Sequence, residues 1–155
     1  MTLIQELMNQ SAAGVAFQPG VIKRFSAQEI RESIQVLVAS EQIDMAFALG
    51  DAGLAIYPNS EDMLAICGLL AVMQQDWPTA VELLQELVEL QGANIQPFTY
   101  VMLVRALRCN LDPMRALTVA REGLALYPEQ LELQAELLSL DDFSGSMMAP
   151  SAGQH

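Results

Sequence analysis

Apolar residues recur at three- and four-residue spacing along almost the whole chain after Ser26. Ile30, Ile34 and Leu37 illustrate this spacing, which draws one apolar stripe along a helix. No stretch shows the strict alternation of apolar and polar residues that is typical of a half-buried strand. The pattern therefore predicts an all-α protein.

Short breaks divide this pattern into separate helices. Asp76 stands two residues before a proline and Asp112 one residue before, so each carboxylate can cap a helix whose first turn accepts the proline. Pro58 and Pro128 stop the helices that precede them. The sequence thus predicts three helix pairs and one last helix, at residues 27–40 with 44–57, 60–75 with 78–91, 96–110 with 113–127, and 129–140.

The phrase GLAIYP at Gly53–Pro58 returns as GLALYP at Gly123–Pro128, 70 positions later. That offset is two periods of 34 residues plus two, and 34 is the period of the tetratricopeptide repeat. A small residue recurs at the same place in three successive second helices, as Ala46, Ala80 and Ala116. On these residues the chain resembles the tetratricopeptide-repeat superfamily.

The resemblance implies an α-solenoid of about three helical hairpins closed by a C-terminal capping helix. The repeats fall at residues 27–60, 61–94 and 97–130, with the capping helix at 129–140, so the repeat domain covers 27–140. Residues 1–26 are expected to form an amphipathic helix, at 1–13, and a linker. Residues 141–155 are small and polar, and we expect a disordered tail.

Composition narrows the range of partners. The apolar share is 52% and the mean hydropathy +0.29, yet the net charge is −12. This combination indicates a well-filled core and some apolar surface kept in solution by carboxylates. Only 7 Lys and Arg face 19 Asp and Glu, which disfavours nucleic acid as a partner. The longest apolar run, Met63–Met73, is too short to span a membrane.

The amino terminus has no cationic region of the kind found in secretory signals, so we expect a cytoplasmic protein. In that compartment Cys67 and Cys109 are expected to be reduced thiols. The single histidine is His155, which leaves no Cys–His pair and no histidine-containing metal site. No glycine-rich phosphate loop or EF-hand pattern occurs. We therefore expect a protein that is not an enzyme and that needs no metal and no cofactor.

The resemblance also implies a concave groove lined by the first helix of each repeat. The groove pattern predicts an apolar trough with cations toward its ends. Its apolar members could equally be core residues between helices. If the trough is a binding site, it suits an amphipathic helix or peptide tail whose acidic groups meet the arginines. The predicted groove residues are Arg31, Gln35, Val38, Ala65, Leu69, Val72, Met73, Phe98, Val101, Arg105 and Arg108.

Size, acidity and the phrases MQQDWPTAVELLQEL and LVRALRCNLDPMRAL resemble the small tetratricopeptide chaperones of bacterial type III secretion. This resemblance implies a cytosolic chaperone that holds an amphipathic helix of a secretion or assembly subunit. Two alternatives stay open. One is a general adaptor or scaffold, and the other is a self-associating structural component, such as a homodimer, that buries residues 1–13 of one chain in the groove of another.

Overall fold

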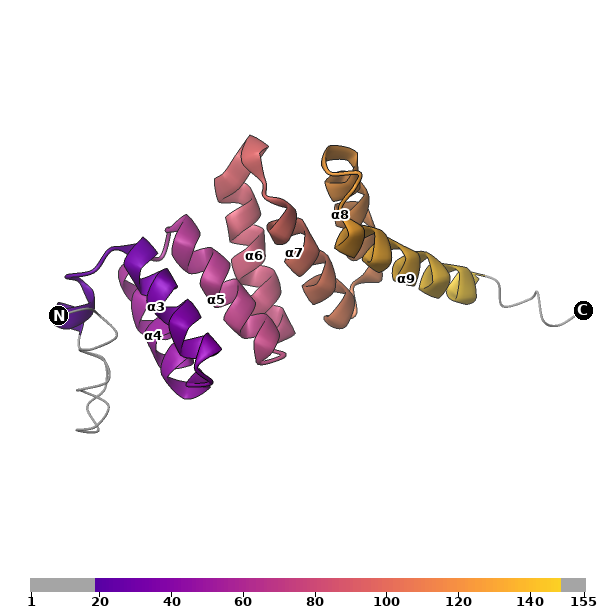
Figure 1. Ribbon diagram of the computed structural model, residues 1–155. Coiled ribbons are helices and arrows are strands. Elements are labelled where there is room, and N and C mark those ends of the chain that lie inside the picture. The colour runs from indigo at the N-terminus through magenta and orange to yellow at the C-terminus, as the bar shows by residue number, and fades with distance from the viewer. Residues whose placement is uncertain (1–18, 149–155) are drawn as a thin grey trace, which may run out of the picture. The chain divides into compact units, whose positions relative to one another are not determined.

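The computed structural model describes residues 19–148 (Figure 1), and within that range it contains α-helices, one short 3₁₀ turn and no strand. The predicted helix at residues 1–13 lies outside the described residues, as does His155. The predicted fold class is confirmed, and all seven predicted helices occur, six of them within two residues of their expected ends. The elements are α2 (Pro19–Ile22), α3 (Ala27–Ala39), α4 (Ile43–Ile56), α5 (Glu61–Met73), α6 (Trp77–Gln91), η1 (Gly92–Asn94), α7 (Pro97–Cys109), α8 (Pro113–Leu126) and α9 (Leu131–Met148).

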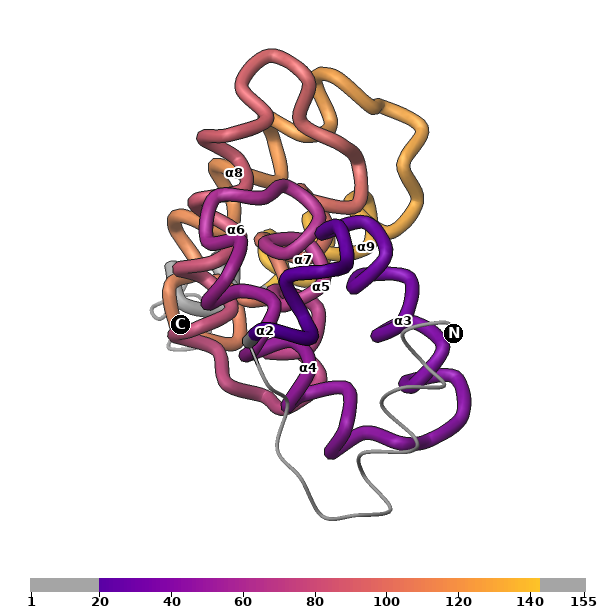
Figure 2. Tube along the Cα trace, turned by 90° about the vertical axis from the view of Figure 1, so that its left-hand side faces the viewer, coloured from indigo at the N-terminus to yellow at the C-terminus, as the bar shows by residue number. Residues whose placement is uncertain are grey.

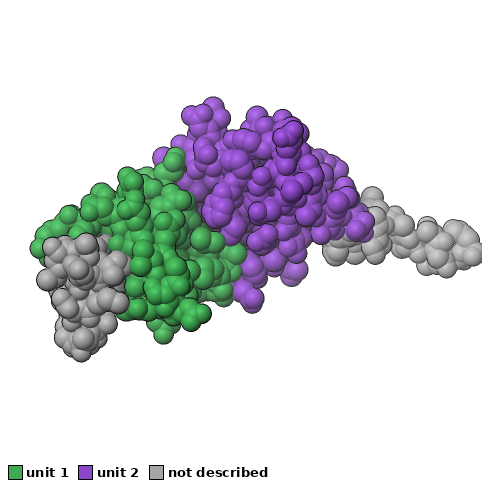
Figure 3. Space-filling model, in the orientation of Figure 1, with its two compact units in different colours: residues 1–74 green, residues 75–155 purple. Residues whose placement is uncertain are grey.

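The chain forms two compact units, residues 1–74 and residues 75–155 (Figure 3). In unit 1, α4 packs against α2, α3 and α5, and α3 also packs against α5. In unit 2, α7 packs against α6, α8 and α9, and α8 packs against α9; the chain path through these helices can be followed in Figure 2. The boundary falls inside the second predicted repeat, whose first helix, α5, belongs to unit 1 and whose second helix, α6, belongs to unit 2.

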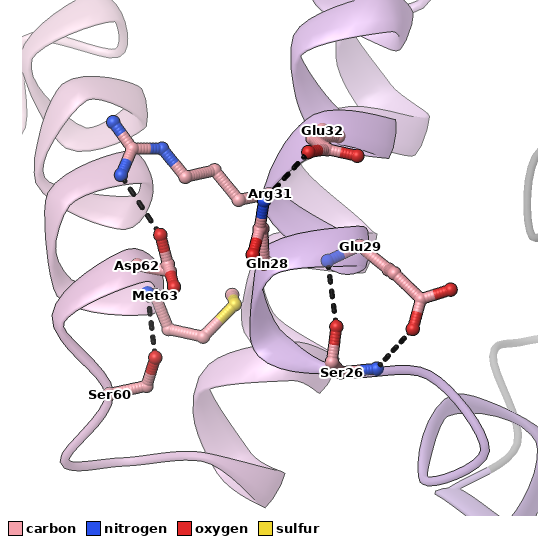
Figure 4. Close-up of polar contacts among 8 residues, drawn as sticks. All are labelled: Ser26, Gln28, Glu29, Arg31, Glu32, Ser60, Asp62 and Met63. Atoms are coloured by element: carbon pink, nitrogen blue, oxygen red, sulfur yellow. Dashed lines mark hydrogen bonds and ion pairs between the residues drawn. The ribbon is translucent and has the colours of Figure 1, made fainter.

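The helix starts follow local chemistry. Ser26 caps α3 in a capping box, in which the Glu29 N–H donates to the Ser26 hydroxyl at 3.1 Å and the Ser26 N–H donates to the Glu29 carboxylate at 3.0 Å (Figure 4). Asp76 and Asp112 accept backbone N–H donors of α6 and α8, each with a proline in the first turn. The two predicted caps are therefore confirmed.

The turns inside the three predicted hairpins share one backbone feature. Glu41, Gln75 and Leu111 have φ values of 63°, 59° and 63°, in the left-handed region that side chains rarely adopt. Each occupies the same position in its predicted repeat. Each is also preceded by the C-cap of one helix and followed by the N-cap of the next. The recurrence supports the register that the sequence predicted.

Close packing inside each unit depends on small residues. Ala46, Ala80 and Ala116 are fully buried, as expected where a large side chain would push two helices apart. The glycines of the repeated phrase are buried as well. A Cβ atom at Gly53 would lie 2.6 Å from Met63 Cε, and one at Gly123 would lie 2.9 Å from the Tyr100 ring. Both positions thus let the second helix of a hairpin approach its neighbours closely.

The tyrosine of the repeated phrase makes the same hydrogen bond twice. The Tyr57 hydroxyl donates to the Phe25 carbonyl at 2.7 Å, and the Tyr127 hydroxyl donates to the Ile95 carbonyl at 2.7 Å. Each carbonyl stands two residues before the first residue of a helix, α3 or α7. The phrase therefore ties the end of a second helix to the start of its first helix, once in each unit.

The predicted boundaries at the two ends of the repeat domain need correction. The last helix, α9, runs to Met148, although the sequence analysis ended it at residue 140 and expected disorder from residue 141. The extension has a local reason, because no proline interrupts the chain before Pro150. Within the predicted linker, Pro19 opens the single-turn helix α2, and Ile22 is fully buried.

Candidate protein-binding faces

The predicted groove residues lie on two faces, one in each unit. The first face consists of Arg31, Gln35 and Val38 of α3 with Ala65, Leu69, Val72 and Met73 of α5. The second face consists of Phe98, Val101, Arg105 and Arg108 of α7.

Helices α3 and α5 run parallel in the first face. Gly53 of α4 approaches Ile30 and Met63, whereas Gly50, one turn earlier in α4, approaches Ile34 and Leu70. Positions therefore advance along α3 and α5 in the same direction. This arrangement brings the first turns of both helices to one end of the face and their last turns to the other.

An ion pair joins α3 and α5 near their N-terminal ends. Arg31 Nη1 donates to Asp62 Oδ1 at 3.1 Å (Figure 4). Both side chains remain over one third exposed, at 36% and 38%, so the pair contributes at most about 1 kcal/mol to stability. The pair nevertheless holds the arginine that the sequence analysis assigned to a partner's carboxylate.

The remaining residues of the first face are mainly apolar and only partly covered. Val38, Leu69 and Val72 are half-buried, and Met73 is 42% exposed. Gln35 is exposed. Ala65 is buried in the core, so the core interpretation holds for this residue.

The second face is built around a carboxylate that the sequence analysis did not single out. Glu136 of α9 is only 7% exposed. Arg108 Nε donates to its Oε2 at 2.7 Å, Arg108 Nη2 to its Oε1 at 3.3 Å, and Arg105 Nε to its Oε1 at 3.3 Å. The hydrogen bond to Glu136 raises the pKa of the Arg108 guanidinium further. Glu136 thus forms ion pairs with both of the arginines that were predicted to meet a partner.

A spacing in the sequence could have revealed these pairs. Arg31 and Asp62 are 31 positions apart, and so are Arg105 and Glu136. In both units the pair links the first helix of one hairpin to the next helix of the same kind. Elsewhere on the second face, Phe98 is exposed and Val101 is buried, so Val101, like Ala65, is a core residue.

The side chains available for covalent or metal chemistry are few in the described part of the chain. Cys67 and Cys109 are both free thiols. Burial, and then the charge of Asp51, raise the pKa of Cys67 from 9.0 to about 12, which keeps it a neutral, unreactive thiol. Among residues 19–148 no three His, Cys, Asp or Glu side chains gather where a metal ion could bind. None of the helices described is long and apolar enough to cross a membrane.

Comparison with known proteins identifies the fold. No family model and no curated protein matches the chain. Solved structures do match, among them a D159K mutant of MamA with a TM-score of 0.69 and 19% identity, covering 91% of this chain and 85% of that one. The fold is tetratricopeptide-like.

Two further structures agree with this conclusion. MamA MSR-1 C2 matches with a TM-score of 0.61 and 17% identity over 90% of this chain and 95% of that one. Acl4 (residues 1–338), an assembly chaperone of RpL4, matches with a TM-score of 0.58 and 17% identity. The match covers 96% of this chain and 59% of Acl4. At such low identity the likeness concerns the fold alone.

Proposed function

We propose that this chain is a non-enzymatic protein-binding module that holds an amphipathic helix of a partner against the first face. The partly exposed strip formed by Val38, Leu69, Val72 and Met73 carries the proposal. A helix whose apolar side chains recur every three or four residues would cover this strip and remove it from water. Each square ångström of apolar surface so buried contributes about 25 cal/mol before the costs of association.

Within this function, the role that we favour is that of a bacterial cytoplasmic chaperone for a secretion or assembly subunit. A helix that drives polymerisation of such a subunit is itself amphipathic, so covering it would hold the subunit unassembled. The likeness of the fold to Acl4, which is an assembly chaperone, supports this role.

The test compares two surface variants of similar exposure. Met73→Glu places a charge in the first face, and Leu90→Glu places one on α6, outside both faces, where the leucine is 48% exposed. Each tagged protein is used to recover partners from its native cytosol, and circular dichroism confirms unchanged helical content. We expect one near-stoichiometric partner that is retained by Leu90→Glu and lost by Met73→Glu.

Equal recovery of that partner by both variants would place the binding site elsewhere. Recovery of the chain alone, with a mass that rises with concentration and falls when residues 1–13 are deleted, would favour the self-associating alternative. A chaperone should also unfold at a clearly higher temperature when its partner is present, because the partner binds only the folded state.

A further inference from the structure

We propose that the helix bound by the first face is cationic, with lysine or arginine beside its apolar side. This inference rests on the proposed function and reverses the charge that the sequence analysis assigned to the partner.

The first argument is that the arginines already have partners in their own units. Arg31 pairs with Asp62 in unit 1, and Arg105 and Arg108 share Glu136 in unit 2. A carboxylate from outside would have to displace one of these pairs. In unit 2 the displacement would take one of its two cations from the buried Glu136, which is unfavourable. An acidic partner therefore gains little from these arginines.

The second argument concerns the end of the first face where its apolar side chains gather. Val38 lies in the last turn of α3, and Val72 and Met73 lie in the last turn of α5. Neither last turn contains a basic residue. The carbonyl end of a helix carries about half a negative charge, and the parallel helices α3 and α5 both end here. The positive N-terminus of α4 offsets part of the charge of α3, and the first turn of α4 carries the acidic Asp44.

An acidic residue, Glu41, follows α3 at this end of the face. The N–H of Glu41 donates to the Val38 carbonyl at 3.0 Å, which fixes the backbone of Glu41 directly after α3, and its side chain is exposed. The net charge of −12 adds a long-range attraction for cations. Apolar side chains next to negative charge are complementary to a helix that carries leucines on one side and cations along the edge. Lysine and arginine stems can lie along the strip while their charged ends reach the carbonyls.

The test uses two synthetic helical peptides of about five turns. In both peptides leucines recur at alternating spacings of three and four residues, so that they form one apolar stripe. All other positions are lysine in one peptide and glutamate in the other. Calorimetry measures the Kd of each for the full chain at low and at physiological salt. We expect the lysine peptide to bind at least about tenfold more tightly at low salt, with a smaller difference when salt screens the charges.

Two variants with the same change of charge separate local from general attraction. Glu41→Lys should weaken the lysine peptide several-fold, whereas Glu82→Lys, an exposed position on α6 in unit 2, should have a much smaller effect. Equal losses in both would overturn the proposal, because binding would then follow overall charge. Tighter binding of the glutamate peptide would overturn it as well.

Leu69→Ala shows which part of the argument fails. If both peptides bind equally and both are weakened by Leu69→Ala, the first face is a docking site but the cationic partner is wrong. If neither peptide binds the wild-type chain, the proposed function fails together with the inference. Circular dichroism of each variant checks that the helices are intact.

Discussion

The two units share one helix-to-helix hydrogen bond but differ in the contact between successive first helices. Both tie a second helix to a first helix through the tyrosine of the repeated phrase. They differ where α3 meets α5 and where α7 meets α9. Unit 1 has Ile66, 2% exposed, at the position that Glu136 takes in unit 2. Gln35 and Val38 likewise stand where unit 2 has Arg105 and Arg108.

This difference shows which residue types the buried position between two parallel helices accepts. A buried position between two parallel helices accepts an isoleucine, whose burial is favourable by itself, or a carboxylate, provided that cations satisfy it. The backbone arrangement is common to both units, but the energetic basis of the contact is not. Unit 2 should therefore depend on charge where unit 1 does not.

Removing the central carboxylate should have the largest effect. We expect Glu136→Ala to lower the free energy of unfolding by about 2 kcal/mol, less than for a fully buried pair because the arginines are partly exposed. Replacing Arg105, Arg108 and Glu136 together by the residues of unit 1, Gln, Val and Ile, should restore stability to within about 1 kcal/mol of wild type. Chemical denaturation measures both. A triple variant as unstable as Glu136→Ala would contradict the equivalence of the two contacts.

Alkaline pH should distinguish the units through Cys67, whose position is taken by Leu137 in unit 2. Its pKa is raised to about 12 in the fold from 9.0, so the thiol's contribution to stability is complete below pH 9 and is lost as pH rises toward 12. The slope is about 1.4 kcal/mol per pH unit. Unfolding of wild type and Cys67→Ala, measured at several pH values, should give curves that converge above pH 9. Parallel curves would contradict the raised pKa.

The smallest effect is expected from removing the tyrosine hydrogen bond that both units share. Tyr57→Phe and Tyr127→Phe each remove one hydroxyl donor and keep the ring, including the edge-on contact of Tyr127 with Tyr100 at 6.3 Å between ring centroids. Each should cost about 1 kcal/mol, and the two losses should agree. Thermal unfolding of the two variants provides the measurement. If only one of the two variants lost stability, the tyrosine of the repeated phrase would not stabilise the two units equally.

The helices and their ends were predictable because the residues that start and stop a helix lie next to it in the sequence. Ser60 before α5 and Asp112 before α8 act as caps through N–H groups three residues away, and a short stretch of sequence contains that information. The repeat register was predictable for a similar reason, since a small residue is required wherever two helices cross. The division of the second repeat between two compact units was not predictable, because it depends on how many neighbours each helix has.

The candidate faces were predictable only as a set of positions. Periodicity placed Ala65 and Val101 beside Leu69 and Phe98, but burial separates them. The same limit applies to charge. A sequence shows that Arg105 is present and does not show that it already forms an ion pair with Glu136 on another helix.

By itself, the sequence determined the helices, their caps and the repeat. Helices and caps follow from interactions within a few residues, and the repeat follows from a sequence pattern that recurs along the chain. Only the tertiary structure decided which apolar residues stay partly exposed and where α9 makes its partly buried ion pairs, and the charge that we propose for a partner rests on these two properties. Those properties arise between residues about thirty positions apart, where burial and pairing depend on the packing of whole helices.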